Sequence, residues 1–210
     1  MIRRHFLISF TIGVLLVMTT GAAVSAAVNC GEPVAAPKWE IGDTWTVQDE
    51  QGEERTETVV GFEGKLVRLE WSYTDRNVVL LVDSDLVLRK VITADGMVLE
   101  RPGRNEWNWI GIRVLHFPLH GGKTWTFRFD RDGTAYWMLY RVLACEKTSI
   151  IAGEFSALKL EATMKLAHGR WEGIIHEWFA PAAKRIVRRT YQRPNFADST
   201  QDWEVLRYRK

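Results

Sequence analysis

The sequence is poor in cysteine and proline, with two and six among its 210 residues, and it has no long apolar run after the N-terminal segment. Without a second apolar run, nothing beyond that segment is expected to span a membrane as a helix. The chain also lacks a Gly-x-Ser-x-Gly pattern and a glycine-rich phosphate loop, so it carries no motif for a serine hydrolase or a nucleotide site. Acidic and basic residues nearly balance, 26 against 28, so overall charge gives no reason to expect nucleic-acid binding.

The start of the chain has the pattern of a signal peptide. Arg3-Arg4 precede an apolar stretch from Phe6 to Met18, and the small-x-small sequence Val24-Ser25-Ala26 follows. We therefore predict a signal peptide over residues 1–26, a single β-domain over residues 27–210, and a periplasmic or secreted location. Because ATP- and nicotinamide-dependent chemistry is disfavoured outside the cytoplasm, we predict no cofactor.

Two export routes stay open. Arg3-Arg4-His5-Phe6-Leu7 matches the core of a twin-arginine signal, which exports proteins already folded. Ile2 and Ile8 depart from that pattern, and no cofactor is expected that would require folding before export. The general secretory route is therefore favoured over the twin-arginine route.

The two cysteines, Cys30 and Cys145, gain significance from the predicted export, because disulfides persist in oxidising compartments. We predict a Cys30–Cys145 disulfide, which in the chain-entropy model stabilises the fold by about 4–5 kcal/mol. The alternatives are two unpaired thiols or lipidation of Cys30. Lipidation is disfavoured because the preceding residues, Ala27-Val28-Asn29, make a poor lipoprotein processing site.

Apolar and polar residues alternate along most of the remaining chain. In residues 67–73 and 125–129, aromatic and aliphatic side chains alternate with charged or hydroxyl ones, which is typical of strands with one buried face. Glycine-containing turn signals such as Glu63-Gly64 and Asp132-Gly133 separate these runs. The pattern predicts an all-β fold: one antiparallel domain, built as a curved sheet or open barrel.

Short sequences recur in the same order along the chain. Gly42-Asp43-Thr44-Trp45-Thr46 returns as Gly122-Lys123-Thr124-Trp125-Thr126, and two further matches follow, residues 67–70 with 158–161 and residues 87–90 with 186–189. We predict two related β-meanders of about five strands each, over residues 37–96 and 117–191. A connecting segment over residues 97–116 would hold one short strand around residues 112–117.

Two stretches in the second half carry a resemblance to a known family. Ala152-Gly153-Glu154-Phe155-Ser156-Ala157-Leu158-Lys159, and Glu177-Trp178-Phe179-Ala180-Pro181 with Ile186-Val187-Arg188, resemble the turns and strands of exported bacterial β-proteins called TapB-like, a family of largely unknown function. The resemblance covers residues 37–191. It implies a curved antiparallel sheet or open barrel in the cell envelope and supplies no catalytic residues. Ile151, Glu154 and Lys184 depart from the family at turn positions, Lys184 standing where a glycine is usual.

The histidines do not form a metal motif. His116 and His120 have the spacing of helical ligands, but Pro118 lies between them in a segment without helical periodicity. His176-Glu177 begins like a zinc-protease motif, but Ala180 stands where its second histidine would be. We therefore predict no metal site, and we interpret Asp132-Gly133 as a hairpin turn rather than part of a calcium loop.

The ten tryptophans are the unusual feature of the composition. Trp45, Trp71 and Trp125 fall on the apolar faces of predicted strands and are expected in the core. The candidate ligand-binding residues are Trp107 and Trp109 in the connecting segment and Trp171 and Trp178 beside acidic residues, as an aromatic platform at the mouth of a concave sheet. The alternative is that the connecting segment folds back and caps an open end of the core.

Two features complete the set of candidates. Glu172 and Glu177 lie beside tryptophans and are the only acids considered for glycoside cleavage. Residues 184–210 carry eight basic and three acidic residues, which suit either an anionic partner or one charged outer face.

The sequence thus favours an exported, non-catalytic envelope protein that has a binding or structural role. Its partner would be an apolar or glycan ligand or another envelope component, with no nucleic acid. The alternative is a hydrolase of envelope polysaccharide that uses Glu172 or Glu177.

Overall fold

The computed structural model describes residues 32–49, 52–100, 110–131, 133–167, 171–192 and 202–209. The predicted signal peptide and Cys30 lie outside the described residues. Within the described ranges, no helix is long and apolar enough to cross a membrane.

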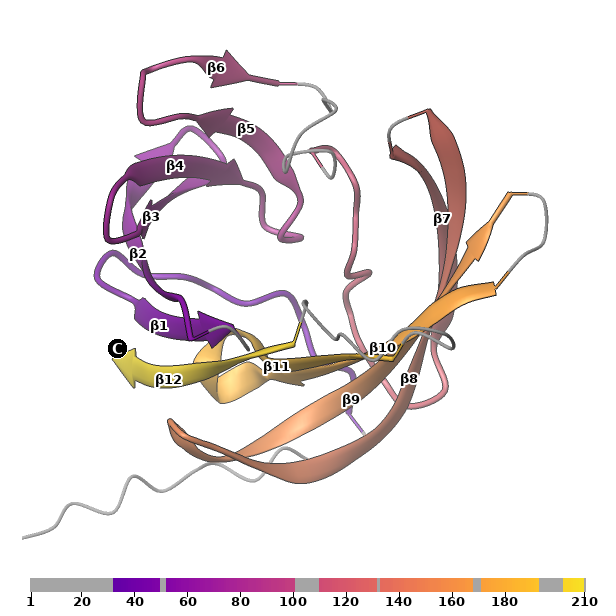
Figure 1. Ribbon diagram of the computed structural model, residues 1–210. Coiled ribbons are helices and arrows are strands. Elements are labelled where there is room, and N and C mark those ends of the chain that lie inside the picture. Colours follow the sequence, from indigo (N-terminus) through magenta and orange to yellow (C-terminus); the bar gives the residue numbers. More distant parts are fainter. Residues whose placement is uncertain are drawn as a thin grey trace, which may run out of the picture.

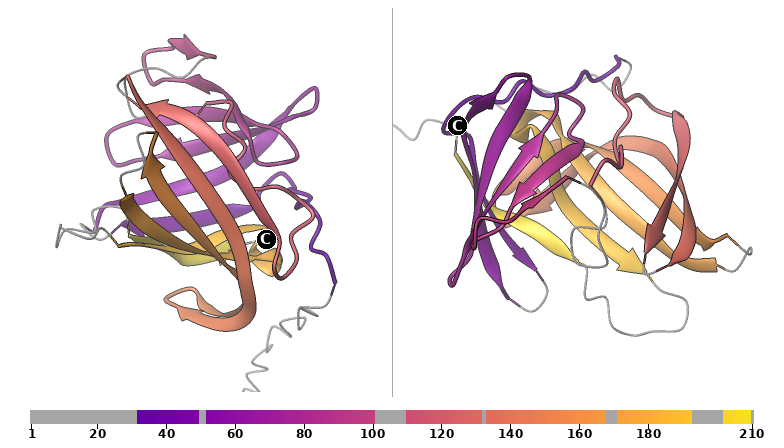
Figure 2. Two further views of the ribbon diagram at one scale, coloured as in Figure 1. Left: turned by 90° about the vertical axis from the view of Figure 1, so that its right-hand side faces the viewer. Right: turned by 90° about the horizontal axis from the view of Figure 1, so that it is seen from above.

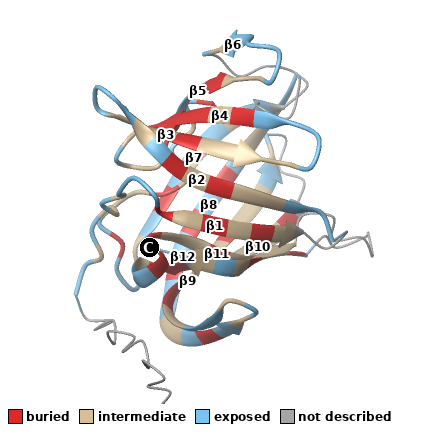
Figure 3. Cartoon of the chain, turned by 90° about the vertical axis from the view of Figure 1, so that its left-hand side faces the viewer, coloured by how far each residue is buried: buried red, intermediate tan, exposed pale blue. Residues whose placement is uncertain are grey.

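The first half of the chain forms a meander of six strands, each hydrogen-bonded to the next (Figure 1). They are β1 (Thr44–Asp49), β2 (Glu54–Glu63), β3 (Leu66–Ser72), β4 (Asn77–Val82), β5 (Leu88–Ile92) and β6 (Val98–Leu99). Hairpin turns join them at glycines with positive φ, as at Gly64 (φ 61°) and Gly96 (φ 83°), where the turn needs a residue without a Cβ. β4 is buried along most of its length (Figure 3).

The second half forms another six-strand meander that ends beside the first. Its elements are β7 (Thr124–Arg131), β8 (Thr134–Ile150), β9 (Gly153–Leu166), β10 (Trp171–Ala180), the 3₁₀ turn η1 (Pro181–Ala183), β11 (Arg185–Gln192) and β12 (Trp203–Arg209). β12 pairs antiparallel with β1, so all twelve strands form one sheet in the order β6-β5-β4-β3-β2-β1-β12-β11-β10-β9-β8-β7. We call the β1–β12 pairing the seam.

The sheet curls into an open barrel. Figures 1 and 2 show it wrapping round so that β5 and β6 approach β7 without pairing to it. All strand pairs are antiparallel, which confirms the predicted fold class. The ranges expected for the two meanders hold five strands each, β1–β5 and β7–β11, while β6 and β12 lie beyond those ranges.

The strand predicted over residues 112–117 is wrong. That segment has no ladder pairing, and the nearest bridge joins Val34 and Leu119. Its carbonyl groups accept side-chain hydrogen bonds instead: the Val114 carbonyl from Trp125 Nε1 at 3.0 Å, and the His116 carbonyl from the Lys123 ammonium at 2.5 Å. Polar side chains therefore take the place of a neighbouring strand.

The recurring sequences occupy corresponding strands in the two meanders. The matched segments fall on β1 and β7, on β3 and β9, and at β5 and β11. The backbone at the start of β1 and β7 is also alike, since Gly42 N–H donates to the Val59 carbonyl and Gly122 N–H to the Val142 carbonyl, both at 2.9 Å. That the two meanders are related remains a hypothesis, which these positions support.

Two apolar clusters form the core. One gathers residues of β1–β5 with η1, β12 and the end of the β8–β9 hairpin, and the other gathers residues of β7–β11 with the segment around Leu115 and Leu119. Trp45 and Trp125 are buried as predicted, while Trp71 is partly buried against the first cluster. The long β8–β9 hairpin curls beneath β12, where Ala152 N–H donates to the Val205 carbonyl at 3.2 Å (Figure 1).

Candidate functional site

Two glutamates are buried on the concave side of the sheet. Glu57 on β2 and Glu177 on β10 have 2% and 0% of their surface exposed. Glu57 lies opposite Trp45 and Trp71 on its two neighbouring strands, so these three side chains share one face. Because a buried carboxylate is costly unless it is paired, its partners define what this face can do.

Glu57 is held by two arginines. Arg185 Nη1, from β11, donates to Glu57 Oε2 at 2.6 Å, and Arg55 Nε, from the same strand, donates to Glu57 Oε1 at 2.9 Å. Burial opposes ionisation of Glu57, but the charges and hydrogen bonds of Arg185 and Arg55 outweigh it and lower its pKa below 4.5. Because β2 and β11 are not neighbours in the sheet, the Glu57–Arg185 ion pair crosses the concave side of the barrel.

Glu177 has an arginine and a tyrosine as partners. Arg189 Nε donates to Glu177 Oε1 at 2.8 Å, and its Nη2 donates to the same oxygen, while the Tyr140 hydroxyl donates to Oε2 at 3.4 Å. Burial together with the charge of Glu177 raises the pKa of Tyr140 well above 10. Both carboxylate oxygens of Glu177 are therefore in use.

Tryptophan rings connect the two ion pairs. The Arg185 guanidinium lies 5.2 Å from the Trp45 ring and 5.7 Å from the Trp203 ring, and the Arg189 guanidinium lies 5.6 Å from the same Trp203 ring. At the opposite end, Arg55 lies 4.5 Å from the ring of Trp71. We call this set the arginine–tryptophan network: Trp71, Arg55, Glu57, Trp45, Arg185, Trp203, Arg189, Glu177 and Tyr140.

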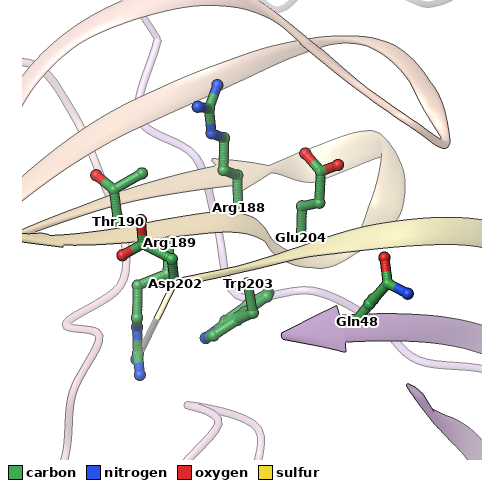
Figure 4. Close-up of a pocket in the computed structure, with 7 residues that line it drawn as sticks. All are labelled: Gln48, Arg188, Arg189, Thr190, Asp202, Trp203 and Glu204. Carbon is green, nitrogen blue, oxygen red and sulfur yellow. The ribbon is translucent and has the colours of Figure 1, made fainter. Parts of the chain in front are cut away.

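A cavity of about 220 Å³ opens at one end of the seam, beside Trp203 and Arg189 of this network. It lies where the β11–β12 ladder is reduced to two residue pairs, compared with six for β1–β12. In Figure 4, Arg188 and Glu204 point to one side of the strands and Arg189 and Trp203 to the other. The lining is one indole with amide, hydroxyl, carboxylate and guanidinium groups: Gln48, Arg188, Arg189, Thr190, Asp202, Trp203 and Glu204.

A third buried ion pair closes the other end of the seam. Lys184 follows η1 with φ 59°, a backbone conformation that favours glycine, and its ammonium donates to Asp43 Oδ2 at 2.6 Å. Asp43 is 1% exposed, and its Oδ1 and the nearby Tyr208 hydroxyl are buried without a hydrogen-bond partner within the described residues. Burial and the charges of Asp43 and Glu40 raise the pKa of Tyr208.

The structure separates the four tryptophans proposed from the sequence. Trp107 and Trp109 lie outside the described residues, and for Trp171 only the backbone position in β10 is described. Trp178 is buried on the side of β10 opposite Glu177, with its Nε1 donating to Glu146 at 2.7 Å and its ring between Lys159 and Arg188. It packs beneath the β8–β9 hairpin rather than in the cavity at the seam.

The other candidates have ordinary surroundings. Among the described residues, no group of three or more His, Cys, Asp and Glu side chains is placed to hold a metal ion. His176 pairs with Glu161 at 3.4 Å, and the ring of His116 stacks on Trp125 at 5.6 Å. Desolvation and the charges of Arg113 and Lys123 lower the pKa of His116. The Cys30–Cys145 disulfide stays a prediction because Cys30 lies outside the described residues.

The interpretation of residues 184–210 as one charged outer face is wrong. Lys184, Arg185 and Arg189 reach buried carboxylates on the concave side. The reason is that each has a buried acid within reach, so its charge is paired rather than hydrated. The sequence held one indication of this, because Arg185 and Arg189 each lie two residues from the apolar Val187, so strand alternation assigns all three to one face. In the fold, this face lies close to Trp203.

Comparisons with known proteins give a distant likeness in shape. No family model matches the sequence, and no curated protein matches it. Among solved structures, an exported-protein candidate with a YmcC-like fold from Bacteroides fragilis has 14% identity over 85% of this chain and 100% of its own, with a TM-score of 0.40.

The hypothetical lipoprotein YmcC from Escherichia coli has 12% identity over 84% of this chain and 90% of its own, with a TM-score of 0.42. A lipoprotein candidate from Parabacteroides distasonis has 10% identity over 85% of this chain and 100% of its own, with a TM-score of 0.39. These names do not include the TapB-like family, so that membership stays a hypothesis. The fold assignment rests on the strand order of this chain.

Proposed function

We propose that this chain is an exported, non-catalytic binding protein of the cell envelope, and that the end of a glycan binds in the cavity at the seam. The observation that carries the proposal is the lining of that cavity, which is rich in side chains that donate and accept hydrogen bonds. Gln48, Arg188, Thr190 and Glu204 lie on one side of the strands, and Arg189 and Trp203 lie on the other. Sugars carry many hydroxyl groups, which amide, hydroxyl, carboxylate and guanidinium side chains can bind.

The size and the surroundings of the cavity favour a glycan over an acyl chain. At about 220 Å³ it is smaller than the roughly 300–1,000 Å³ pockets that take drug-sized ligands, so it suits a single ring. The apolar side chains of the concave face are buried against each other in the two core clusters. A fatty acid would have to displace them, whereas a sugar ring would contact groups that already face the cavity.

The burial of Glu177 supports a non-catalytic role. A general acid must reach the bond that it cleaves, and Glu177 is 0% exposed with both oxygens occupied by Arg189 and Tyr140. Its partners give it a structural role on the concave face. The side chain of Glu172 lies outside the described residues.

Calorimetric titration of the purified protein tests the proposal. Neutral and uronate-containing oligosaccharides form one set of ligands, and a soluble fatty acid such as dodecanoate forms the other. Gln48→Ala and Thr190→Val each remove one polar group from the cavity, and each is expected to weaken saccharide binding about fivefold, the value of one hydrogen bond. Gln192→Ala is the matched control, because Gln192 is exposed at the end of β11 and does not line the cavity.

Three results would contradict the proposal. The first is a heat of binding for dodecanoate and none for the saccharides. The second is no heat of binding for any ligand. The third is saccharide binding with an affinity that Gln48→Ala and Thr190→Val leave unchanged.

A further inference from the structure

The outer surface of β8 exposes large apolar side chains in a row. Trp137, Leu139 and Leu143 have 47%, 45% and 38% of their surface accessible, although residues of this kind are normally covered. They follow one another on the outer face because the buried Met138, Tyr140 and Val142 occupy the alternate positions. This stripe lies on the opposite face of the sheet from the arginine–tryptophan network.

Cations flank the stripe at its widest point. The register places Arg128 on β7 and Lys165 on β9 directly opposite Trp137, one on each side, and both are exposed. One step along β8, Leu139 lies between Thr126 and Thr163. Two residues beyond Leu139, Arg141 is also exposed. The left-hand view of Figure 2 faces this side of the molecule, with β7 and the adjoining part of β8 nearest the viewer.

Nearby acids cancel only part of this charge. Glu161 lies opposite Arg141 but is already within 3.4 Å of His176, and Asp130 is near the end of β7. The row Arg128–Trp137–Lys165 has no acid in it. The surface therefore presents a tryptophan between two cations, beside exposed leucines.

From this surface we infer that the outer face of β8, defined by Trp137, Leu139, Leu143, Arg128, Arg141 and Lys165, docks on an anionic membrane surface. Tryptophan prefers the boundary between headgroups and acyl chains, where its ring is partly apolar and its N–H stays hydrated. Lysine and arginine beside it reach the phosphates, and each contributes through attraction to anionic lipid. The exposed leucines favour lipid over glycan, because an aliphatic side chain gains by entering acyl chains and offers a sugar no hydrogen bond.

Vesicle co-sedimentation of the purified protein tests this inference. Vesicles of phosphatidylcholine alone are compared with vesicles that also contain phosphatidylglycerol. The protein is expected to sediment with the anionic vesicles and to be released by salt. Arg128→Ala and Lys165→Ala should each weaken binding about fivefold, and Trp137→Ala with Leu139→Ser should remove the quenching of tryptophan fluorescence by brominated acyl chains.

Matched substitutions elsewhere on the surface distinguish binding through this face from nonspecific adsorption to vesicles. Phe62 is 54% exposed on the first meander, and Arg207 and Arg209 are exposed on β12. Phe62→Ser and the Arg207→Ala/Arg209→Ala pair should leave vesicle binding unchanged. Urea unfolding of every variant checks that the fold is intact.

The inference is overturned by an absence of binding to anionic vesicles, or by binding that the β8 substitutions leave intact. It is also overturned if a soluble polyuronate binds this face in place of vesicles and loses affinity with the same substitutions, because the partner would then be a glycan. Because Gln48 and Thr190 lie in the seam cavity, their variants should still bind vesicles, which keeps the two proposals separately testable.

Discussion

Lys184 combines an unfavourable backbone conformation with a buried ion pair, so replacing it with glycine sets two effects against each other. Its φ of 59° costs an L-residue about 1–2 kcal/mol, which glycine would relieve. Glycine also gives the unfolded chain more conformational freedom, which destabilises the folded state by about 0.4–1 kcal/mol and offsets part of that gain. On backbone grounds alone, Lys184→Gly would therefore be neutral or stabilising by about 1 kcal/mol.

The side chain gives the opposite and larger effect. Without the Lys184 ammonium at 2.6 Å, the carboxylate of Asp43, which is 1% exposed, keeps one donor among the described residues, the Glu40 N–H at 2.8 Å. Leaving a buried charge without its partner costs about 3–5 kcal/mol. We therefore expect Lys184→Gly to lower the free energy of unfolding by about 2–4 kcal/mol, although it restores the residue that the backbone favours.

Urea unfolding, followed by circular dichroism, measures this difference as a shift in midpoint at unchanged slope. Lys184→Met keeps the strained backbone and loses the charge, so it should be less stable than Lys184→Gly by about 1 kcal/mol. Asp43→Asn combined with Lys184→Gly removes both charges and should recover much of the loss, because Asn can still accept from Glu40 N–H. A Lys184→Gly protein as stable as the wild type would refute the reasoning, since the ion pair would then contribute nothing.

Two further substitutions test the concave face. Because the pKa of Glu57 is lowered in the folded state, its stabilisation is fully present above pH 4.5 and is lost as the pH falls through the folded-state pKa. Glu57→Gln should therefore lower the free energy of unfolding by about 3–5 kcal/mol at pH 7. In the variant, the urea midpoint should also fall less steeply with decreasing pH on the acid side. An unchanged acid limb would show that other carboxylates control acid unfolding. Gly173→Ala places a Cβ 2.9 Å from the Gln192 carbonyl oxygen and from the Tyr191 ring. We expect this substitution to destabilise the protein by about 1–3 kcal/mol in thermal unfolding. A variant as stable as the wild type would mean that the strands separate easily at that point.

The strands were predictable because their evidence is local. Alternation along residues 67–73 and glycine at Gly64 and Gly96 are each determined by a few neighbouring residues, and they locate strands and hairpin turns without knowledge of the rest of the fold. The same local rule failed over residues 112–117, because the hydrogen bonds that replace a ladder there come from Lys123 and Trp125.

The candidate site was not predictable in the same way. A binary pattern assigns charged residues to the solvent side, so it placed Arg185 and Arg189 outside. Each contacts a carboxylate on another strand, and Glu57 is 128 residues away from Arg185. A register shift between Trp178 and Phe179 also changes which face the following residues occupy, and no sequence period marks such a bulge.

The buried polar contacts bear on how the two meanders join. Between the meanders, β1 pairs with β12 over six residue pairs. Within the described residues, β12 has two ladder pairs with β11 and one hydrogen bond with the β8–β9 hairpin, from Ala152 N–H to the Val205 carbonyl. Three contacts bypass that weak ladder and tie η1 and β11 directly to the first meander: Glu57 with Arg185, Asp43 with Lys184, and Trp45 Nε1 with the Ala183 carbonyl at 2.8 Å. Apolar contacts tolerate a slipped register, whereas slipping any of these would leave a buried charge or N–H without its partner. These contacts therefore fix the register in which the two meanders join, as well as stabilising the seam. A Lys184→Gly protein should show not only a lower urea midpoint but also faster amide hydrogen exchange along β12.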